Sequence, residues 1–308
     1  MNALTEGTMN SQRDVIEKLG KSLIQHGKFN DRIYLMKLAK EDFPAIIDNI
    51  EGLALTYEYS KIFAKIPAWA KGEFVNAGYK EEAFIPCFYH GEEDVYFLGK
   101  YFSKSRIKLT DSEKIKDVLQ VAREKGDERQ TKIESEGQLA AITEKGKKVA
   151  PMKLKNGFRF EIADQSHVSE MAKVYAKVFK TYPFPIDDPN YLLKTMQEKV
   201  VYFSIWHHNK IVALSSSEMD MEAENVEMTD FATLPEYAGQ GFALFLLGKM
   251  EEEMQKRGIK IAYTIARALS YGMNITFAKL KYKYSGTLVN NTNIGGDLES
   301  MNVWYKSL

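Results

Sequence analysis

The chain has 308 residues, and 42 lysines and arginines balance 42 aspartates and glutamates. That length allows two ordinary domains, each with its own core. Without a net positive charge, nucleic acids and anionic membranes are not expected as partners. The single cysteine, Cys87, excludes an intramolecular disulfide and a cysteine-cluster metal site, and it is typical of a reducing compartment. No apolar run approaches the roughly 20 residues that span a bilayer, so a soluble, cytoplasmic protein is expected.

The first half has the patterns of a small α/β domain. Periodicity and turn residues predict, in chain order, an amphipathic helix at 13–24, a strand at 32–38, a helix at 43–53, a strand at 59–66, a short helix at 69–76, strands at 82–89 and 94–101, and a helix at 111–125. Residues 126–156 are rich in charge and glycine, which is typical of a surface connection. These patterns predict an N-terminal domain over residues 1–155.

The second half is more regular. Its predicted elements are a strand at 158–163, helices at 166–179 and 190–198, strands at 200–206, 211–219 and 226–233, a helix at 242–256, a strand at 261–265, a helix at 271–280, and strands near 286–290 and 301–305. The expected fold class is α/β (α+β), with a mixed twisted sheet flanked by helices. The C-terminal domain is expected to cover residues 156–308.

The most informative segment, residues 233–243, follows a predicted strand and opens an apolar helix. Gly239 and Gly241 let backbone N–H groups converge at a helix N-terminus, which can hold a pyrophosphate without a basic side chain. A plain turn without a ligand is an equally good interpretation of this segment alone. The third glycine of a dinucleotide-binding motif and the Gly-Lys-Ser/Thr of a P-loop are both missing, which disfavours hydride transfer and nucleotide hydrolysis.

The loop and the order of elements around it resemble the GNAT acetyltransferase superfamily, whose motif reads Arg/Gln-x-x-Gly-x-Gly/Ala. Gly241 and Ala243 match the motif, whereas Ala238 stands where the family usually has Arg or Gln. The resemblance implies that acetyl-CoA binds as co-substrate, that no metal is needed, and that the Phe231 N–H faces the thioester oxygen as an oxyanion donor. The cofactor-binding residues it implies are Phe231, Ala232, Thr233, Ala238, Gly239, Gln240, Gly241, Phe242, Ala243, Ser270, Asn274 and Phe277.

Longer segments resemble the β-lysine N6-acetyltransferase family. They are residues 228–231, 266–268, 286–291 and 299–305, together with 32–38, 61–68 and 78–101 in the first half. The family's N-terminal region itself resembles part of a GNAT domain that has lost its cofactor loop. The resemblance implies acetyl transfer to the terminal amine of 3,6-diaminohexanoate (β-lysine), giving a neutral-zwitterionic compatible solute for osmoadaptation.

A general base is required whatever the amine acceptor is. A lysine-like amine has a pKa of about 10.4 and must lose a proton before it attacks a thioester. Glu227 and Asp230 lie on the strand before the loop, and Glu218 lies near the end of the neighbouring strand. Strand alternation predicts that Glu227 and Asp230 face opposite sides, so that they do not act together. Asp230 is the favoured base, although a purely structural role is as good an interpretation for any one of these carboxylates.

A proton donor for the leaving thiolate is the second group that the reaction can use. GNAT enzymes often use a tyrosine of the late helix, and Phe277 stands at that place here. Tyr282 and Tyr271 are the nearby substitutes, although a thiolate can leave with little help. Asn274 can bond the pantetheine arm or the local backbone equally well. His207 and His208 are expected to be a solvated pair in a turn and not a metal site.

A zwitterionic diamine needs carboxylates for its ammonium groups and donors for its carboxylate. The candidate substrate-binding residues are Tyr182, Phe184, Glu218, Asn290, Asn291 and Glu299. Another diamine, a polyamine or an amino acid is the alternative acceptor, and a non-catalytic acetyl-CoA-binding regulator is the alternative class. The two halves are expected to pack as an intramolecular pseudo-dimer, while further oligomerisation is left open.

Overall fold

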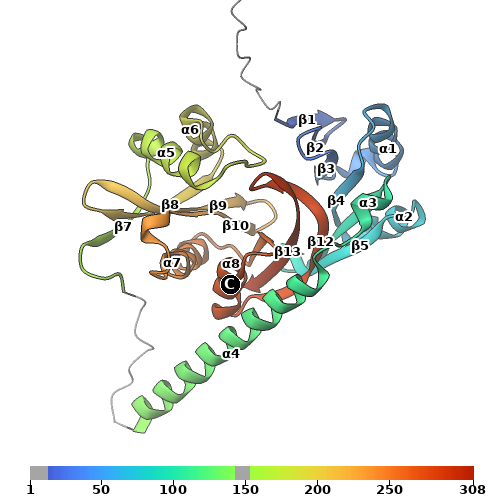
Figure 1. The fold of residues 1–308 in the computed structure, drawn as a ribbon. Helices are drawn as coiled ribbons and strands as arrows, with labels where there is room; N and C mark the ends of the chain where they lie inside the picture. Colours follow the sequence, from blue (N-terminus) through green and yellow to red (C-terminus); the bar gives the residue numbers. More distant parts are fainter. Residues whose placement is uncertain (1–12, 143–152) are drawn as a thin grey trace, which may run out of the picture.

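The computed structural model describes residues 13–142 and 153–308 (Figure 1). The first half runs β1 (Val15–Leu19), β2 (Ser22–Gly27), β3 (Arg32–Lys37), α1 (Ile46–Thr56), β4 (Lys61–Pro67), α2 (Lys71–Asn76), β5 (Lys80–Tyr89), β6 (Glu93–Tyr101), α3 (Lys104–Ile107) and α4 (Ser112–Ile142). Short 3-10 turns η1 (Lys40–Asp42) and η2 (Ala68–Ala70) precede α1 and α2. Among the described helices, none is long and apolar enough to cross a membrane.

The second half contains more and longer strands. It runs β7 (Phe158–Ile162), η3 (Gln165–His167), α5 (Val168–Val178), α6 (Pro189–Gln197), β8 (Val200–His207), β9 (Lys210–Asp220), β10 (Asn225–Thr233), η4 (Pro235–Tyr237), α7 (Phe242–Lys256), β11 (Ile261–Arg267), α8 (Tyr271–Lys279), β12 (Lys283–Ile294) and β13 (Asp297–Ser307). The expected mixed sheet with flanking helices is therefore present in this half.

The strand order is repeated between the two halves. In the described chain, one sheet has the order β1-β2-β3-β4-β6-β5 and the other has the order β12-β13-β11-β10-β9-β8-β7. In each sheet one parallel pair, β3 with β4 and β10 with β11, is followed by a last antiparallel hairpin whose later strand lies inside. A helix, α1 or α7, connects the strands of each parallel pair. The first half thus repeats the topology of β8 to β13.

The halves share a hydrophobic core. One face of the first sheet packs on its own helices, through residues such as Ile33, Ile62 and Leu98. The opposite face, reached by alternation along the same strands, packs against the second sheet. That shared cluster contains Tyr34, Phe63, Ala83, Ile85, Phe88, Val95 and Phe97 from the first half, and Ile261, Tyr263, Leu288, Ile294, Met301 and Val303 from the second. Figure 1 shows β12 beside β5, where this contact is made.

The amphipathic helix expected at residues 13–24 is wrong. These residues form the hairpin of β1 and β2, which turns at Gly20 with a φ of +66°. Val15 and Ile16 on β1 are exposed, while Ile24 on β2 is fully buried. A hairpin with one exposed strand mixes charged and apolar residues in the same way as an amphipathic helix, so the local pattern did not separate the two.

The surface connection expected from residue 126 is also wrong over its first part. Helix α4 continues to Ile142 and packs along α8 (Figure 1). Gly126 lies inside the helix, where a Cβ atom would meet the Ala278 carbonyl oxygen at 3.0 Å. This glycine allows close helix packing and does not end the helix. The rest of the expected connection includes residues 143–152, which lie outside the described residues.

Candidate active site

The site begins where β10 and β11 separate. These parallel strands are paired only at Asn225–Glu227 and Ile261–Tyr263. Beyond Glu227, β10 has no register partner on β11, whereas β11 stays paired with β13 as far as Arg267. The backbone edge of β10 that points toward β11 is therefore open over residues 228–233. An extended substrate can add to such an edge as a further strand would.

An irregularity in β10 changes which side chains face the site. The register of β10 against β9 shifts between Thr229 and Ala232, and Asp230 has a φ of +54°. A bulge of this kind breaks the two-residue alternation of a strand. Glu227 and Asp230 consequently line one cavity. The expectation that they face opposite sides is wrong, because it assumed a regular strand.

The glycine loop follows directly at the end of β10. Gly239 and Gly241 have φ values of +76° and +79°, and Gly241 is the residue before the first turn of α7. A Cβ atom at either position would meet nothing within 4 Å, so the loop is open above both glycines. The left-handed backbone, and not crowding, is what requires glycine here. Backbone N–H groups at this helix N-terminus suit a diphosphate.

The separated part of β10 borders a cavity of about 300 Å³, lined by both halves of the chain. The second half contributes Tyr182, Phe184, Phe231 and Phe277 among its apolar and aromatic walls, and the first half contributes residues of β3 and β4. Aromatic walls with a few convergent charged groups are the usual composition of a small-molecule site. The cavity is therefore the candidate active site.

Four carboxylates line the cavity: Asp220, at the end of β9, pairs with Lys37, and the other three are Glu218, Glu227 and Asp230. Glu218 and Glu227 face each other across β9 and β10, and Asp230 follows on the bulge. Asp230 accepts hydrogen bonds from the Tyr182 hydroxyl and, at 2.6 Å, from the Ser216 hydroxyl. Burial raises the pKa of Asp230 above its usual range despite these donors. Burial likewise raises the pKa of Glu227, which receives a hydrogen bond from Tyr263.

Glu218 is the carboxylate most open to the cavity. Its side chain has accessible surface on the cavity wall, yet the surrounding protein raises the pKa of its carboxyl well above the usual range, with Asp230 and Glu227 as further causes. Each carboxylate is thus less stable as an anion than in water. A cationic ligand between them relieves that cost, so the group is suited to bind an ammonium ion.

Two cationic side chains from the first half complete the cavity. Arg32 begins β3 and Lys65 lies on β4, and both side chains line the cavity. Lys65 Nζ lies 3.4 Å from the Tyr263 hydroxyl and offsets part of the negative charge of Glu218 and Glu227. The cavity therefore has an anionic side on β9 and β10 and cationic groups on β3 and β4.

Known proteins resemble the chain over nearly its whole length. A β-lysine N6-acetyltransferase of Methanococcus maripaludis is 44% identical over 291 residues, which are 94% of this chain and 98% of the relative. The chain belongs to the β-lysine N6-acetyltransferase family. A second protein of that name, from Methanosarcina mazei, is 34% identical over 86% of this chain and 98% of its own length. The chain is accordingly an acetyl-CoA-dependent N-acetyltransferase.

The fold of the second half is that of the GNAT superfamily. Residues 169–271 match the model of the acetyltransferase (GNAT) family. Among solved structures, the ribosomal-protein-S18-alanine N-acetyltransferase of Escherichia coli aligns with a TM-score of 0.43 and 14% identity, over 49% of this chain and 93% of its own. The residues that match the family model, 169–271, include β8 to β11 and the glycine loop, so the expected class of fold is confirmed.

The residues at the strand separation and the loop fit acetyl-CoA. The open edge of β10 suits its amide-containing pantetheine arm, and the loop N–H groups suit its diphosphate. Phe231 lines the cavity, whereas the Ala232 and Phe242 side chains are buried in the core and leave only their backbone atoms for a ligand. Ala238 and Gln240 lie in the loop, Thr233 ends β10 and Ala243 lies in the first turn of α7.

Of the residues expected on the late helix of this acetyltransferase, one lines the cavity and two are bonded within the protein. Phe277 lines the cavity. Ser270 caps α8 by accepting a hydrogen bond from the Met273 N–H at 3.4 Å. The Asn274 amide is fully used within the protein, since its oxygen accepts from Asn302 and from the Trp304 indole, each at 2.9 Å. Of the two roles considered for Asn274, the structure therefore supports bonds within the protein and not a bond to the pantetheine arm.

Tyr282 is not brought to the cavity. It packs edge-to-face on Phe277 with ring centroids 5.1 Å apart, and it lines a different hollow, beside α4. Burial raises the pKa of its hydroxyl well above the usual range. The other substitute, Tyr271, hydrogen-bonds Asp117 of α4 and does not line the cavity either. The structure thus gives neither tyrosine a position from which it can protonate a thiolate in the cavity.

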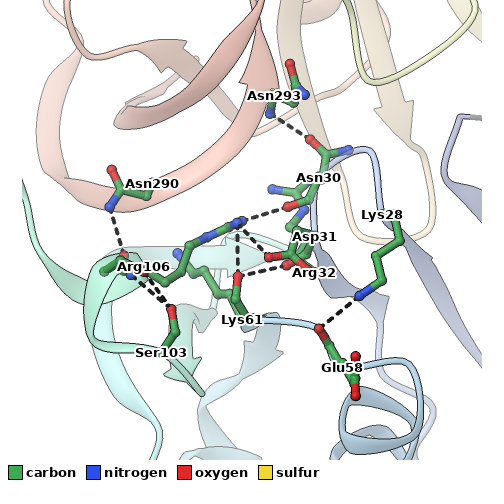
Figure 2. A network of polar contacts seen from close by, with 12 residues as sticks. Lys28, Asn30, Asp31, Arg32, Glu58, Lys61, Ser103, Arg106, Asn290 and Asn293 are labelled. Atoms are coloured by element: carbon green, nitrogen blue, oxygen red, sulfur yellow. Dashed lines mark hydrogen bonds and ion pairs between the residues drawn. The ribbon is translucent and has the colours of Figure 1, made fainter. Parts of the chain in front are cut away.

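The candidate acceptor residues also divide. Tyr182, Phe184, Glu218 and Asn291 line the cavity. Asn290 instead donates to the carbonyl oxygens of Arg106 and Lys108, at 2.8 and 3.0 Å, and so ties β12 to the first half (Figure 2). Glu299 forms an ion pair with Arg267. Asn290 and Asn293 of β12 therefore serve in the contact between the halves, whereas Asn291 faces the cavity.

Sequence reasoning missed the contribution of the first half. Arg32, Tyr34 and Lys65 line the cavity, as does Tyr263 of β11. Alternation along β3 places Arg32 on the same side as Tyr34 and Met36, which was the available signal. Only the packing of one half on the other shows that this side faces the substrate cavity.

Proposed function

We propose that this acetyltransferase moves acetyl from acetyl-CoA to the N6 amine of β-lysine, forming N6-acetyl-β-lysine as a compatible solute in the cytoplasm. The observation that carries the proposal is the cavity itself, in which carboxylates of β9 and β10 face cations of β3 and β4 beside the open edge of β10. A diamine with one carboxylate needs this combination of charges. The two family members that share its length carry that activity in their names.

The proposed reaction uses Asp230 as general base. The thioester supplies an activated acyl carbon next to the open edge of β10. Glu218, Glu227 and Asp230 attract the ammonium group, and Asp230 accepts the proton that the amine must lose. The C–N bond then forms as the C–S bond breaks; the nitrogen releases its second proton to solvent, and the leaving thiolate takes up a proton from solvent. Tyr182 and Ser216 hold the Asp230 carboxylate in place through their hydroxyl groups.

We also propose that the two halves, residues 1–155 and 156–308, form an intramolecular pseudo-dimer. The repeated strand order and the shared hydrophobic cluster support this arrangement. The first half lacks a glycine loop after β3, where Leu38 to Pro44 lead into α1 instead. A half without a loop for the diphosphate supplies walls to its partner's cavity and no second catalytic centre.

The proposal is tested by measuring free thiol released from acetyl-CoA with β-lysine, α-lysine, spermidine and putrescine as acceptors, against acceptor-free controls. We expect a strong preference for β-lysine, with acetylation at N6 located by NMR of the product. Preference for spermidine or putrescine would keep the enzyme class and overturn the substrate. Acetyl-CoA binding without thiol release for any acceptor would instead indicate a regulator.

A further inference from the structure

Arg32 is a buried guanidinium that belongs to the first half and reaches the cavity of the second. Its residue is 4% exposed. One nitrogen, Nη1, donates to the Asn291 carbonyl oxygen and, at 3.2 Å, to the Thr292 hydroxyl on β12. Those bonds hold the side chain against β12 and satisfy one of its three guanidinium nitrogens.

The rest of the guanidinium lies against the Tyr34 and Phe63 rings and has no further hydrogen bond or ion pair among the described residues. Nε is buried without a hydrogen bond, and Arg32 takes part in no ion pair within 4.0 Å in the described chain. The Asn291 side-chain oxygen, on the same cavity wall, is also buried and unpaired. Burying a cation and leaving donors unpaired is costly, so such groups are normally matched by an anion.

The neighbouring buried cations show that this protein usually supplies that anion itself. Lys61, one strand away, is fully buried and forms an ion pair with Glu82 at 2.9 Å. Arg106 lies 3.7 Å from Asp31 and donates to the Asn30 carbonyl oxygen at 2.7 Å (Figure 2). Arg32 lies in the same network, and no described carboxylate pairs with it. Burial lowers the pKa of Arg32 to about 10.

We propose that Arg32 binds the carboxylate of the acceptor, so that the first half of the chain selects amino acids over plain diamines. The inference rests on the proposed function, in which the acceptor carries one carboxylate and two ammonium groups. Arginine is suited to the task because its planar fork matches a carboxylate. Glu218, Glu227 and Asp230 lie on the other side of the cavity and take the ammonium groups.

Two other cations line the cavity, Arg267 and Lys65, and the surroundings of both argue against the same role. Arg267 already pairs with the Glu299 carboxylate, which leaves Lys65 as the alternative. Lys65 lies beside Tyr263, and its positive charge stabilises the anionic forms of Glu218 and Glu227. A carboxylate bound there would stand next to two other carboxylates. Arg32 is accompanied by Tyr34, Phe63 and the hydroxyl of Thr292, which add no negative charge. The carboxylate end of the acceptor is thus assigned to Arg32.

The test compares two acceptors that differ only in the carboxylate. β-Lysine and 1,4-diaminopentane share both amines, and the second lacks the carboxylate. For Arg32→Met we expect kcat/KM for β-lysine to fall by at least about 30-fold, mostly through KM, while kcat/KM for 1,4-diaminopentane stays within about threefold of the unmodified enzyme. Arg32→Lys should restore part of the loss, because it keeps the charge without the fork.

Arg106→Met is the matched control. Arg106 is another buried arginine of the network between the halves, and it does not line the cavity. Its substitution should alter the two acceptors equally. If Arg32→Met lowered both acceptors by the same factor, Arg32 would be a structural residue and the inference would be overturned.

A second variant keeps the test decisive if Arg32→Met does not fold. Asn291→Asp places a carboxylate on the wall where the Asn291 oxygen is unpaired, and it should pair with Arg32 and exclude the acceptor carboxylate. Selective loss of activity toward β-lysine would support the inference, and unchanged selectivity would contradict it.

The test also separates the inference from the choice of substrate. If the unmodified enzyme proved to prefer another amino acid, β-lysine would be discarded as substrate. The same variants, assayed with that amino acid and its decarboxylated form, would still test Arg32.

Discussion

Asp230 combines burial, a bulged backbone and two hydroxyl donors, and these make its ionisation measurable in the reaction. Because burial raises its pKa, the carboxylate becomes protonated as the pH falls through a range above the usual one for aspartate. A protonated Asp230 cannot accept a proton, so kcat/KM should decline on that acidic side. Asp230→Asn should lower kcat/KM by about 100- to 10,000-fold and remove this decline from the pH profile.

The control for Asp230 is Glu161→Gln, which removes an exposed carboxylate from β7 that pairs with Arg159. It should leave the pH profile unchanged. If the Asp230→Asn enzyme kept the acidic decline in kcat/KM, Asp230 would not be the general base. Glu218 or Glu227, whose pKa values are also raised, would then be assigned that role.

Lys61 and Glu82 form the most buried ion pair of the contact between the halves. Both side chains are at most 4% exposed, and Lys61 also donates to the Val289 carbonyl oxygen at 2.8 Å. Lys61→Met leaves the Glu82 carboxylate buried without its cation, and should lower the free energy of unfolding by about 3–5 kcal/mol. Denaturant titration followed by fluorescence measures this change.

The control for Lys61 is Lys71→Met. Lys71 pairs with Glu81 at 2.7 Å, but the two side chains are 34% and 45% exposed, so the expected loss is under about 1 kcal/mol. Equal losses for the two variants would show that the buried pair adds no more than a surface pair.

Individual residues were predictable where a local pattern requires them. Gly239 and Gly241 were found because a left-handed backbone before a helix needs glycine, and Glu218 and Asp230 because they lie on strands next to that loop. Arg32 and Lys65 were missed because their role depends on how a second sheet packs, which no local pattern encodes. Asn290 was assigned to the acceptor from its place in the chain, while its side chain bonds the first half.

At the scale of elements, the junction of β10 and α7 depends on the backbone of Gly241. An alanine in this left-handed conformation costs about 1–2 kcal/mol, although nothing would obstruct its Cβ atom. Gly241→Ala should therefore reduce stability by that amount and weaken acetyl-CoA binding measured by calorimetry, since the loop relieves the strain by changing shape. Gly52→Ala, in the open middle of α1, should instead stabilise the protein by about 0.4–1 kcal/mol. An unchanged affinity in Gly241→Ala would separate the loop from cofactor binding.

Elements whose type was set by long periodic patterns were predicted well, as α5, α7 and β8 to β11 show. The failures are at the hairpin of β1 and β2, where charge and apolar residues alternate without a clear period, and in α4 beyond residue 125. In α4, a glycine and many charges indicated a loop, but contact with α8 stabilises the helix through tertiary packing. The bulge at Asp230 was not predictable either, because an inserted residue leaves no sign in the composition of a strand.

For the whole molecule, the first half has two structural roles although it has no loop for a diphosphate. It covers the apolar face of the second sheet, through Phe63, Phe88 and Phe97 against Ile261 and Tyr263. It also supplies Arg32 and Lys65 to the cavity. Stability and acceptor recognition therefore depend on the same contact, and they should be lost together when the halves are separated.

Separate expression of the halves tests that dependence. A fragment of residues 156–308 exposes Ile261, Tyr263 and Val303 and lacks the cations of β3 and β4, so it should aggregate, as followed by light scattering and size-exclusion chromatography. Co-expression with residues 1–155, which carry α4 and the rest of the shared cluster, should restore a soluble complex and acetylation of β-lysine. A fragment of residues 156–308 that is monomeric, soluble and as selective as the full chain would contradict the shared core and the recognition by Arg32 at once. A soluble fragment that acetylates diamines but no longer prefers β-lysine would contradict the need for the shared core. It would still support recognition by Arg32, because acceptor choice would require the first half.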